Sequence, residues 1–309
     1  MAASKKTGGL AGVTAGKTEL CTVGQEGAGL TYRGYDIYDL VDHASFEEVA
    51  YLLLHGKLPT RAELDAYIAR LVTLRGLPDD LKTVLEMIPA DTHPMDVQRT
   101  GVSFLGNIEP EGDFANQADT ADRLLACLPS ILLYWHRFHT DGTRIDTTTD
   151  DDSVAGHFLH MLHDKPPSEL HRKCLDTTLI LYAEHEFNAS TFAGRVITGT
   201  LSDMHSAVTG AIGALRGPLH GGANEAAMEL IQQYDNADDA TKGIHEKLAN
   251  KDLIMGFGHR VYTTSDPRNS VNKRMSKALA EEKGDMTLYE VSEAIEKVMW
   301  DEKMLFANA

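Results

Sequence analysis

The feature that most restricts the fold is a helical periodicity that runs, with few breaks, from about residue 46 to residue 306. Apolar residues recur every three to four positions, and capping pairs such as Ser45 with Glu48 mark helix starts. Predicted strands never alternate with helices, which excludes a Rossmann fold and a β/α barrel. Residues 30–36 predict one short β hairpin. We therefore expect an all-α protein with a minor β hairpin near its N-terminus.

The predicted helices are separated by proline, glycine and small polar residues, which are the usual punctuation of helix ends. They span residues 46–55, 60–74, 78–87, 93–105, 119–139, 153–163, 168–181, 206–215, 225–234, 240–250, 267–282 and 292–306. The composition changes after Gly222. This change predicts two domains, a large helical one over 1–221 and a small helical one over 222–309.

The chain is acidic, with a formal net charge of −17 and a pI near 5.2, which argues against nucleic acid or an anionic membrane as a partner. No apolar run approaches the ~20 residues that a membrane span requires. Three cysteines, an odd number without metal-binding spacing, indicate a reducing compartment. We therefore expect a cytoplasmic protein.

Two segments each place a histidine among glycines, where backbone can approach a ligand closely. His220 stands where a Gly-Pro turn enters a predicted helix, and the positive end of the helix dipole there favours a neutral ring. His259 lies between Gly258 and the Asp-Pro turn that precedes Arg268. The planar guanidinium of Arg268 suits a carboxylate.

These residues carry a resemblance. Residues 256–268 (GFGHRVYTTSDPR), 217–221 (GPLHG) and 183–191 (AEHEFNAST) resemble motifs of the citrate synthase family, and they stand in the right order along the chain. The resemblance covers the chain from about residue 8 to residue 309. Thr263 and residues 182–187 are more similar to the 2-methylcitrate synthases within that family.

The resemblance implies an acyltransferase that condenses propionyl-CoA, and also acetyl-CoA, with oxaloacetate and water to give 2-methylcitrate or citrate and CoA. It implies that His220 and His259 are catalytic, donating hydrogen bonds to the thioester oxygen and to the oxaloacetate carbonyl. His185 and Arg268 would bind oxaloacetate. The CoA thioester would be a co-substrate, with no permanently bound cofactor, and the protein would be a homodimer.

The resemblance also suggests residues that bind CoA. The backbone of Leu253, Ile254, Met255, Gly256 and Phe257 would face the adenine ring. Arg137 resembles an arginine that binds a CoA phosphate, although its place in an amphipathic helix fits a surface side chain equally well.

Other functions stay open. Within the family the alternative is citrate synthase of the tricarboxylic acid cycle; outside it, a non-catalytic acyl-CoA-binding protein or a metal-dependent hydrolase. His157, His160 and His163 are spaced so that they rotate around a helix instead of converging, so we expect no metal site. The family's catalytic aspartate would directly follow Ala309. We therefore expect this chain to be truncated at its C-terminus and inactive without that residue.

Overall fold

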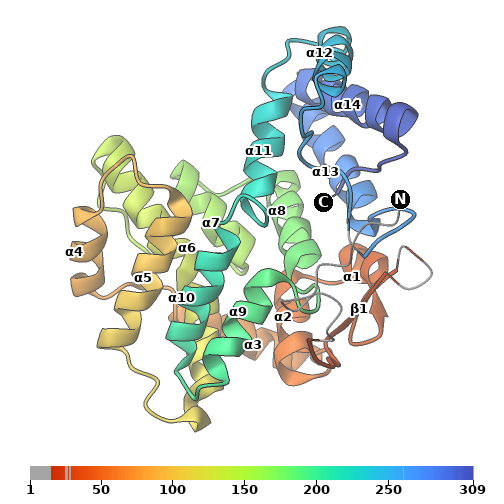
Figure 1. The fold of residues 1–309 in the computed structure, drawn as a ribbon. Coiled ribbons are helices and arrows are strands. Elements are labelled where there is room, and N and C mark those ends of the chain that lie inside the picture. The colour runs from red at the N-terminus through yellow and green to blue at the C-terminus, as the bar shows by residue number, and fades with distance from the viewer. Residues whose placement is uncertain (1–14, 25–26, 28, 260, 309) are drawn as a thin grey trace.

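The computed structural model describes residues 15–24, 27, 29–259 and 261–308, and these fold into a mainly helical protein (Figure 1). The helices are α1 Ile37–His43, α2 Phe46–His55, α3 Arg61–Thr73, α4 Asp79–Met87, α5 Pro94–Ile108, α6 Gln117–Asp141, α7 Val154–His163, α8 Glu169–Tyr182, α9 Ala189–Thr198, α10 Met204–Leu215, α11 Gly222–Ile231, α12 Ala237–Ala249, α13 Pro267–Lys283 and α14 Thr287–Lys303, with a 3₁₀ turn η2 Phe114–Asn116. The predicted all-α fold is confirmed. In the described ranges, no helix is long and apolar enough to cross a membrane.

The helix starts show why the sequence pattern was informative. Ser45 accepts a hydrogen bond from the backbone N–H of Glu48, whose side chain bonds back to the Ser45 backbone, so the predicted capping box is present. Thr60 and Glu63 form a second capping box at the start of α3. Pro129 lies inside the 25-residue helix α6, which continues past it.

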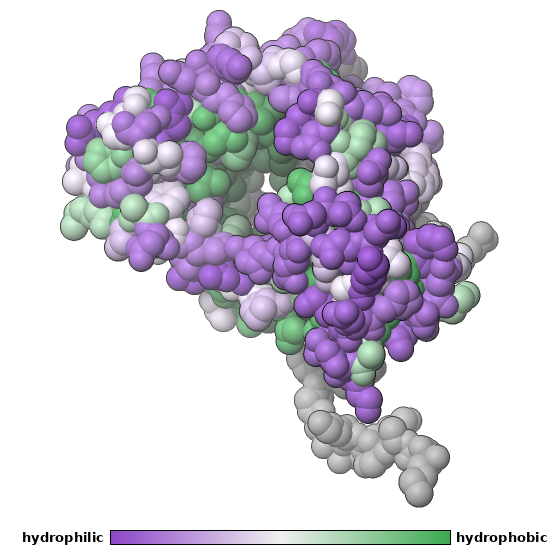
Figure 2. Space-filling view, turned by 90° about the horizontal axis from the view of Figure 1, so that it is seen from above, coloured by the Kyte–Doolittle hydropathy of each residue, from purple (hydrophilic) through white to green (hydrophobic). Residues whose placement is uncertain are grey.

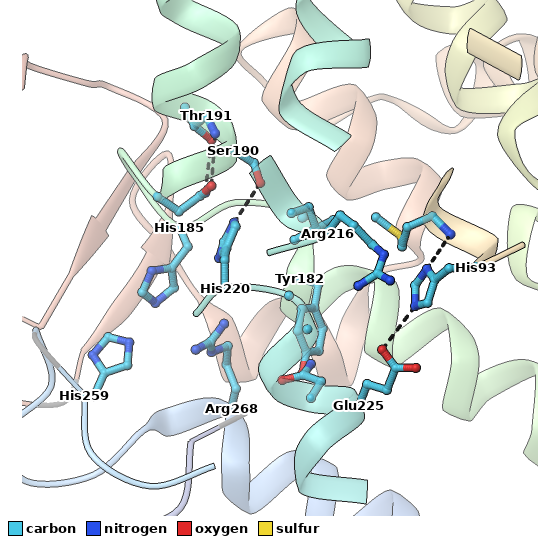
Figure 3. A pocket seen from close by; sticks show the side chains of 17 residues that line it. His93, Tyr182, His185, Ser190, Thr191, Arg216, His220, Glu225, His259 and Arg268 are labelled. Carbon is cyan, nitrogen blue, oxygen red and sulfur yellow. Dashed lines mark hydrogen bonds and ion pairs between the residues drawn. The ribbon is translucent and has the colours of Figure 1, made fainter. Parts of the chain in front are cut away.

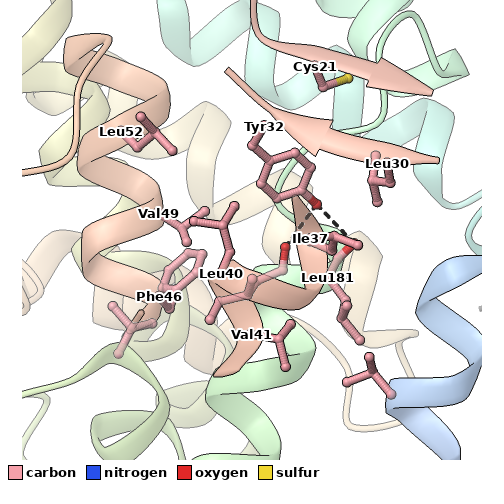
Figure 4. Close-up of a cluster of buried hydrophobic side chains, with 13 residues drawn as sticks. Cys21, Leu30, Tyr32, Ile37, Leu40, Val41, Phe46, Val49, Leu52 and Leu181 are labelled. Atoms are coloured by element: carbon pink, nitrogen blue, oxygen red, sulfur yellow. Dashed lines mark hydrogen bonds between the residues drawn. The ribbon is translucent and has the colours of Figure 1, made fainter. Parts of the chain in front are cut away.

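The β structure is a three-stranded antiparallel sheet made of β1 Cys21–Val23, β2 Leu30–Tyr32 and β3 Tyr35–Asp36. Thr31 pairs with Asp36 and Tyr32 with Tyr35, so the predicted hairpin over 30–36 is confirmed. Strand β1 extends it, with Cys21 paired to Tyr32. Tyr32 is fully buried, and its hydroxyl lies 2.9 Å from the Ile180 carbonyl oxygen at the end of α8. Figure 4 shows this aromatic ring inside the apolar cluster that the sheet shares with α1, α2 and α8.

Two helices are absent from the sequence predictions. Helix α1 begins directly after β3, where Asp36 accepts a hydrogen bond from the N–H of Tyr38. Helix α9 begins after Asn188, whose side chain accepts from the N–H of Thr191. Both caps are polar residues of the expected type.

The C-terminal third of the chain has an apolar core of its own. Leu230, Ile244, Ile254, Val291 and Ile295 are buried together between α11, α12 and α14. Separate clusters hold α1, α2 and α8 together, and α4, α5 and α6 together. Figure 2, seen from above, shows hydrophobic surface along the wall of a central hollow with mostly hydrophilic surface around it. The domain boundary near residue 222 stays a prediction that this separate core favours.

Candidate active site

A cavity of about 740 Å³ is lined by residues from α8, α9, α13, the start of α5 and the turn between α10 and α11. His185, His220, His259 and Arg268 all line it, although they come from segments up to 83 residues apart. Figure 3 shows these four side chains grouped at one end of the cavity, while His93, Arg216 and Glu225 lie at the other. The structure therefore brings together all four side chains that the sequence assigned to catalysis and oxaloacetate binding.

His220 is held by a tight turn that ends as α11 begins. Its backbone N–H donates to the Gly217 carbonyl oxygen at 3.0 Å, and its own carbonyl accepts from Ala223. A Cβ atom on Gly221 would lie 2.6 Å from the Leu215 carbonyl oxygen, so only glycine fits there. The His220 Nε2 lies 2.7 Å from the Ser190 hydroxyl oxygen on α9. Burial lowers the pKa of His220, which keeps the ring neutral near pH 7.

The tautomer of His259 follows from its hydrogen bonds. Its Nδ1 accepts from the backbone N–H groups of Val261 and Tyr262, each at 3.0 Å. A nitrogen that accepts cannot carry the proton, so the Nε2 of the neutral ring does. Burial, with a further contribution from Arg268, lowers the pKa of His259 against the opposing effect of Asp266. His259 is therefore a neutral hydrogen-bond donor through Nε2.

His185 lies beside His259, with 5.5 Å between the ring centroids and the rings nearly perpendicular. Its Nε2 is 3.1 Å from the hydroxyl oxygen of the buried Tyr262. Burial and the nearby positive charge of Arg268 lower the pKa of His185 to about 4. His185, His220 and His259 are therefore uncharged near neutral pH, and Arg268 supplies the positive charge at this end.

Arg268 stands in the first turn of α13 and is held in place by Asp266. The Asp266 carboxylate accepts from the Arg268 backbone N–H, from Nε at 3.0 Å and from Nη2 at 2.7 Å. The Asp266 side chain is fully buried and that of Arg268 is 9% exposed. Burial alone would lower the pKa of Arg268, but these bonds raise it. The guanidinium group is thus charged and fixed in direction before any substrate binds.

Several residues of the site were not singled out from the sequence. Ser190 and Tyr262 fall inside the matched motifs, so a closer examination of those motifs could have found them. The contact between His93 Nε2 and Glu225 Oε2, 3.1 Å across the cavity, joins residues 132 positions apart. No local pattern predicts such a pair.

The residues that the resemblance assigns to CoA binding differ in their surroundings: some line a cavity, one is exposed and one is buried. Met255, Gly256 and Phe257 line a second cavity of about 170 Å³ next to α11, α13 and α14. Leu253 is 78% exposed, and Ile254 is buried in the core of the C-terminal third. These positions leave the proposed backbone contacts with adenine untested.

Arg137 is not brought to either cavity. Its side chain is 10% exposed and forms an ion pair with Asp141 at 2.8 Å, while Nη1 donates to the Met161 carbonyl oxygen. It is therefore neither a surface side chain nor a lining residue of the histidine cavity. The bond to Met161 ties α6 to α7. The contact of Arg137 with CoA stays a prediction.

Two of the three histidines of α7, His157 and His160, have structural partners. His157 is buried, with Nε2 3.0 Å from the Ser130 hydroxyl and Nδ1 3.0 Å from the Thr149 hydroxyl. His160 pairs with Asp151 at 2.8 Å. Within the part of the chain that the structure describes, no three His, Cys, Asp or Glu side chains are grouped so that they could hold a metal ion.

Comparison with known proteins identifies the family. The family model for the citrate synthase C-terminal domain matches residues 9–309. The chain is 62% identical to a 2-methylcitrate synthase of Shewanella oneidensis, over 99% of this chain and 82% of the relative. It is 41% identical to a citrate synthase of Haloferax volcanii, over 97% and 81% of the two chains.

A solved structure agrees with these relatives. It is the ternary complex of carboxymethyl coenzyme A and oxaloacetate with citrate synthase from Thermoplasma acidophilum, and it superposes with a TM-score of 0.89. That alignment has 31% identity and covers 96% of this chain and 80% of the other. The cavity geometry, the sequence relatives and the shared fold together show that this chain belongs to the citrate synthase family.

Proposed function

We propose that this protein condenses an acyl-CoA thioester with oxaloacetate and releases CoA, with propionyl-CoA as acyl donor and 2-methylcitrate as product. The observation that carries the proposal is the convergence of His185, His220, His259 and Arg268 in one cavity. The 62% identical 2-methylcitrate synthase and the wider set of relatives support the same activity.

The proposed roles follow from charge and tautomer. Oxaloacetate carries carboxylates, and Arg268 offers a fixed, charged guanidinium for one of them. His259 would donate its Nε2 hydrogen to the keto oxygen, where negative charge develops as the new carbon–carbon bond forms. His185 lies beside both Tyr262 and His259 and would contact the same substrate.

His220 would act on the other substrate. Enolisation of a thioester places negative charge on its oxygen. A neutral hydrogen-bond donor stabilises that charge while keeping its own proton. Burial keeps the ring of His220 neutral, and Ser190 fixes its orientation. The acyl group would therefore lie at the His220 side of the cavity and oxaloacetate at the His259 side.

A thiol-release assay with propionyl-CoA and acetyl-CoA, each with and without oxaloacetate, tests the proposal on the full-length protein. We expect oxaloacetate-dependent release with a higher kcat/KM for propionyl-CoA. A higher value for acetyl-CoA would favour citrate synthase, which the Haloferax volcanii relative represents. Binding of either thioester without release would favour the non-catalytic alternative.

We also propose a homodimer. Helix α9 has no buried residue, although it contains Phe192, Val196 and Ile197, and Val196 is 56% exposed. The glycines of α9 and α10 already serve contacts inside the subunit, since a Cβ on Gly210 would lie 2.1 Å from the side chain of Ile197. The side of α9 that carries the exposed Val196 is therefore free to pack on a second copy. Light scattering showing a monomer would refute this.

Two further proposals concern organisation and location. The separate apolar core of α11, α12 and α14 supports a small domain over 222–309 beside a large one over 1–221. Cys21, Cys127 and Cys174 are free and buried, which supports a reducing, cytoplasmic location.

A further inference from the structure

The small N-terminal sheet touches both backbone segments that carry the oxaloacetate-side histidines. Cys21 in β1 lies against the segment after α8, which contains His185. Gly27, between β1 and β2, accepts hydrogen bonds from Thr263 and Thr264, which follow His259 along the chain. The sequence predicts a hairpin here but assigns it no function.

The first contact fixes the backbone on both sides of His185. The Cys21 thiol sulfur accepts from the Glu186 backbone N–H at 3.0 Å, and its S–H points to the Glu184 carboxylate at 3.5 Å. Cys21 is 4% exposed. Glu186 has a φ of 54°, in the left-handed region that non-glycine residues adopt only when surrounding contacts hold them there.

Tyr32 adds a second support to the same segment. Its hydroxyl lies 2.9 Å from the Ile180 carbonyl and 3.2 Å from the Leu181 carbonyl. The same oxygen accepts from the Glu184 backbone N–H at 3.4 Å. The end of α8 and the start of the His185 segment are therefore both attached to β2.

The second contact fixes the segment after His259. The Gly27 carbonyl accepts from the backbone N–H groups of Thr263 and Thr264, at 2.9 and 3.2 Å. Gly27 has a φ of +93°, and a Cβ atom there would lie 2.7 Å from both threonine hydroxyl oxygens. The turn therefore needs glycine at this position for its backbone geometry and for its close approach to the threonines.

Tyr262 connects the two segments directly. Its hydroxyl meets His185 Nε2 at 3.1 Å, and its backbone N–H donates to His259 Nδ1 at 3.0 Å. The hairpin thus holds one segment through Cys21 and Tyr32 and the other through Gly27, while Tyr262 links the histidines that these segments carry. The hairpin and Tyr262 therefore both connect the two segments that carry the rings.

We propose that the β1–β2 hairpin is a brace that sets the distance and orientation between His185 and His259, with Cys21 and Gly27 as positioning residues for oxaloacetate binding. The expected effect on oxaloacetate binding rests on the proposed function. The connection of the hairpin to the two histidine segments does not. Neither residue lines the cavity, so each acts through the backbone that it holds.

Two variants with matched controls test the brace. Cys21→Ala removes the thiol that holds Glu186, and Cys174→Ala removes another buried thiol, which contacts Met275. Gly27→Ala adds a methyl group against Thr263 and Thr264. Gly34→Ala is its control, because Gly34 lies in the same sheet with a similar left-handed φ of +89°. The added methyl group there has no atom within 4 Å, so this variant carries the backbone strain without the steric contact.

Hydrogen–deuterium exchange and calorimetry with oxaloacetate are measured on all four variants and the parent. We expect faster amide exchange in residues 184–187 for Cys21→Ala and in 261–264 for Gly27→Ala, with oxaloacetate affinity about fivefold to tenfold weaker in both. The two controls should match the parent in both measurements. Cys21→Ser, which keeps a donor and an acceptor, should recover most of the affinity.

Unchanged exchange in both segments, or equal exchange in test and control variants, would overturn the brace. Faster exchange with unchanged oxaloacetate affinity would overturn its role in positioning the histidines. If the parent does not bind oxaloacetate at all, the proposed function fails, and the exchange data alone then decide whether the hairpin holds the two segments.

Discussion

Replacing Asp266 by Asn isolates the electrostatic part of the site. In the structure, one Asp266 oxygen accepts from the backbone N–H and Nε of Arg268, and the other accepts from Nη2. An asparagine oxygen can keep the first pair, but its NH₂ group then faces Nη2, donor against donor. Arg268 would be left 9% exposed without a negative partner on that side.

The expected loss is large because the pair is buried. Removing one partner of such a pair costs about 3 kcal/mol, and a large domain loses about 2 °C in Tm for each kcal/mol, which gives a decrease of about 6 °C. Asp203→Asn is the matched control, since Asp203 caps α10 by accepting from Ser206 and its side chain is 45% exposed. Asparagine caps helices about as well as aspartate, so the control should change Tm by little.

Differential scanning calorimetry on the two variants gives the comparison, and initial rates give the KM for oxaloacetate. We expect that KM to rise in Asp266→Asn because the guanidinium group is no longer held in direction. Equal Tm values for the two variants, or an unchanged KM for oxaloacetate, would refute the reasoning that Asp266 both neutralises and aims Arg268.

The remaining predictions use the same cavity. His220→Ala and His259→Ala should each lower kcat about a hundredfold or more, since each removes one donor to developing charge; rates within a few-fold of the parent would reject these roles. Arg268→Lys should raise the KM for oxaloacetate more than that for acyl-CoA, because lysine lacks the planar fork; equal increases would place Arg268 elsewhere. A double-mutant cycle on His93 and Glu225, read by thermal unfolding, should show greater coupling than the pair His171 and Glu282, whose histidine is more exposed, and equal coupling would contradict a link across the cavity. The pKa of His185 is about 4 in the folded protein and near 6.5 in the unfolded chain, so the unfolded chain binds more protons between these pH values. Tm should therefore fall as the pH is lowered through this window. His185→Asn should reduce that fall, and a pH profile of Tm identical to that of the parent would contradict the pKa shift.

Local patterns predicted most helices because caps and periodicity act within a few residues. The capping boxes at Ser45 and Thr60 are examples. Helix α9 carried an equally good cap at Asn188, but its segment was interpreted only as a ligand-binding motif. Arg137 shows what periodicity cannot predict. The pattern correctly placed this residue on a helix, but it could not show that α7 packs against the side chain. Asp141, four residues later, was the local signal for its ion pair.

The site itself was predictable only where a motif spans it. His185, His220, His259 and Arg268 lie within matched motifs, and the structure brings them together. The contact of Tyr262 with His185 depends on how the chain folds back over 77 residues. The tautomer of His259 depends on the local turn that directs the N–H groups of Val261 and Tyr262 to its Nδ1. The attachment of the N-terminal hairpin to both histidine segments depends on tertiary structure in the same way.

The central claim is that oxaloacetate binds between His259, His185 and Arg268 while the acyl-CoA thioester meets His220. A crystal structure of the full-length protein with oxaloacetate and carboxymethyl coenzyme A tests it most directly, since that pair was trapped in the Thermoplasma acidophilum enzyme. We predict His259 Nε2 within hydrogen-bonding distance of the keto oxygen, a carboxylate on Arg268, and the acyl end of the analogue beside His220. Oxaloacetate bound away from His259 and Arg268, or an analogue whose acyl end does not reach His220, would contradict the account.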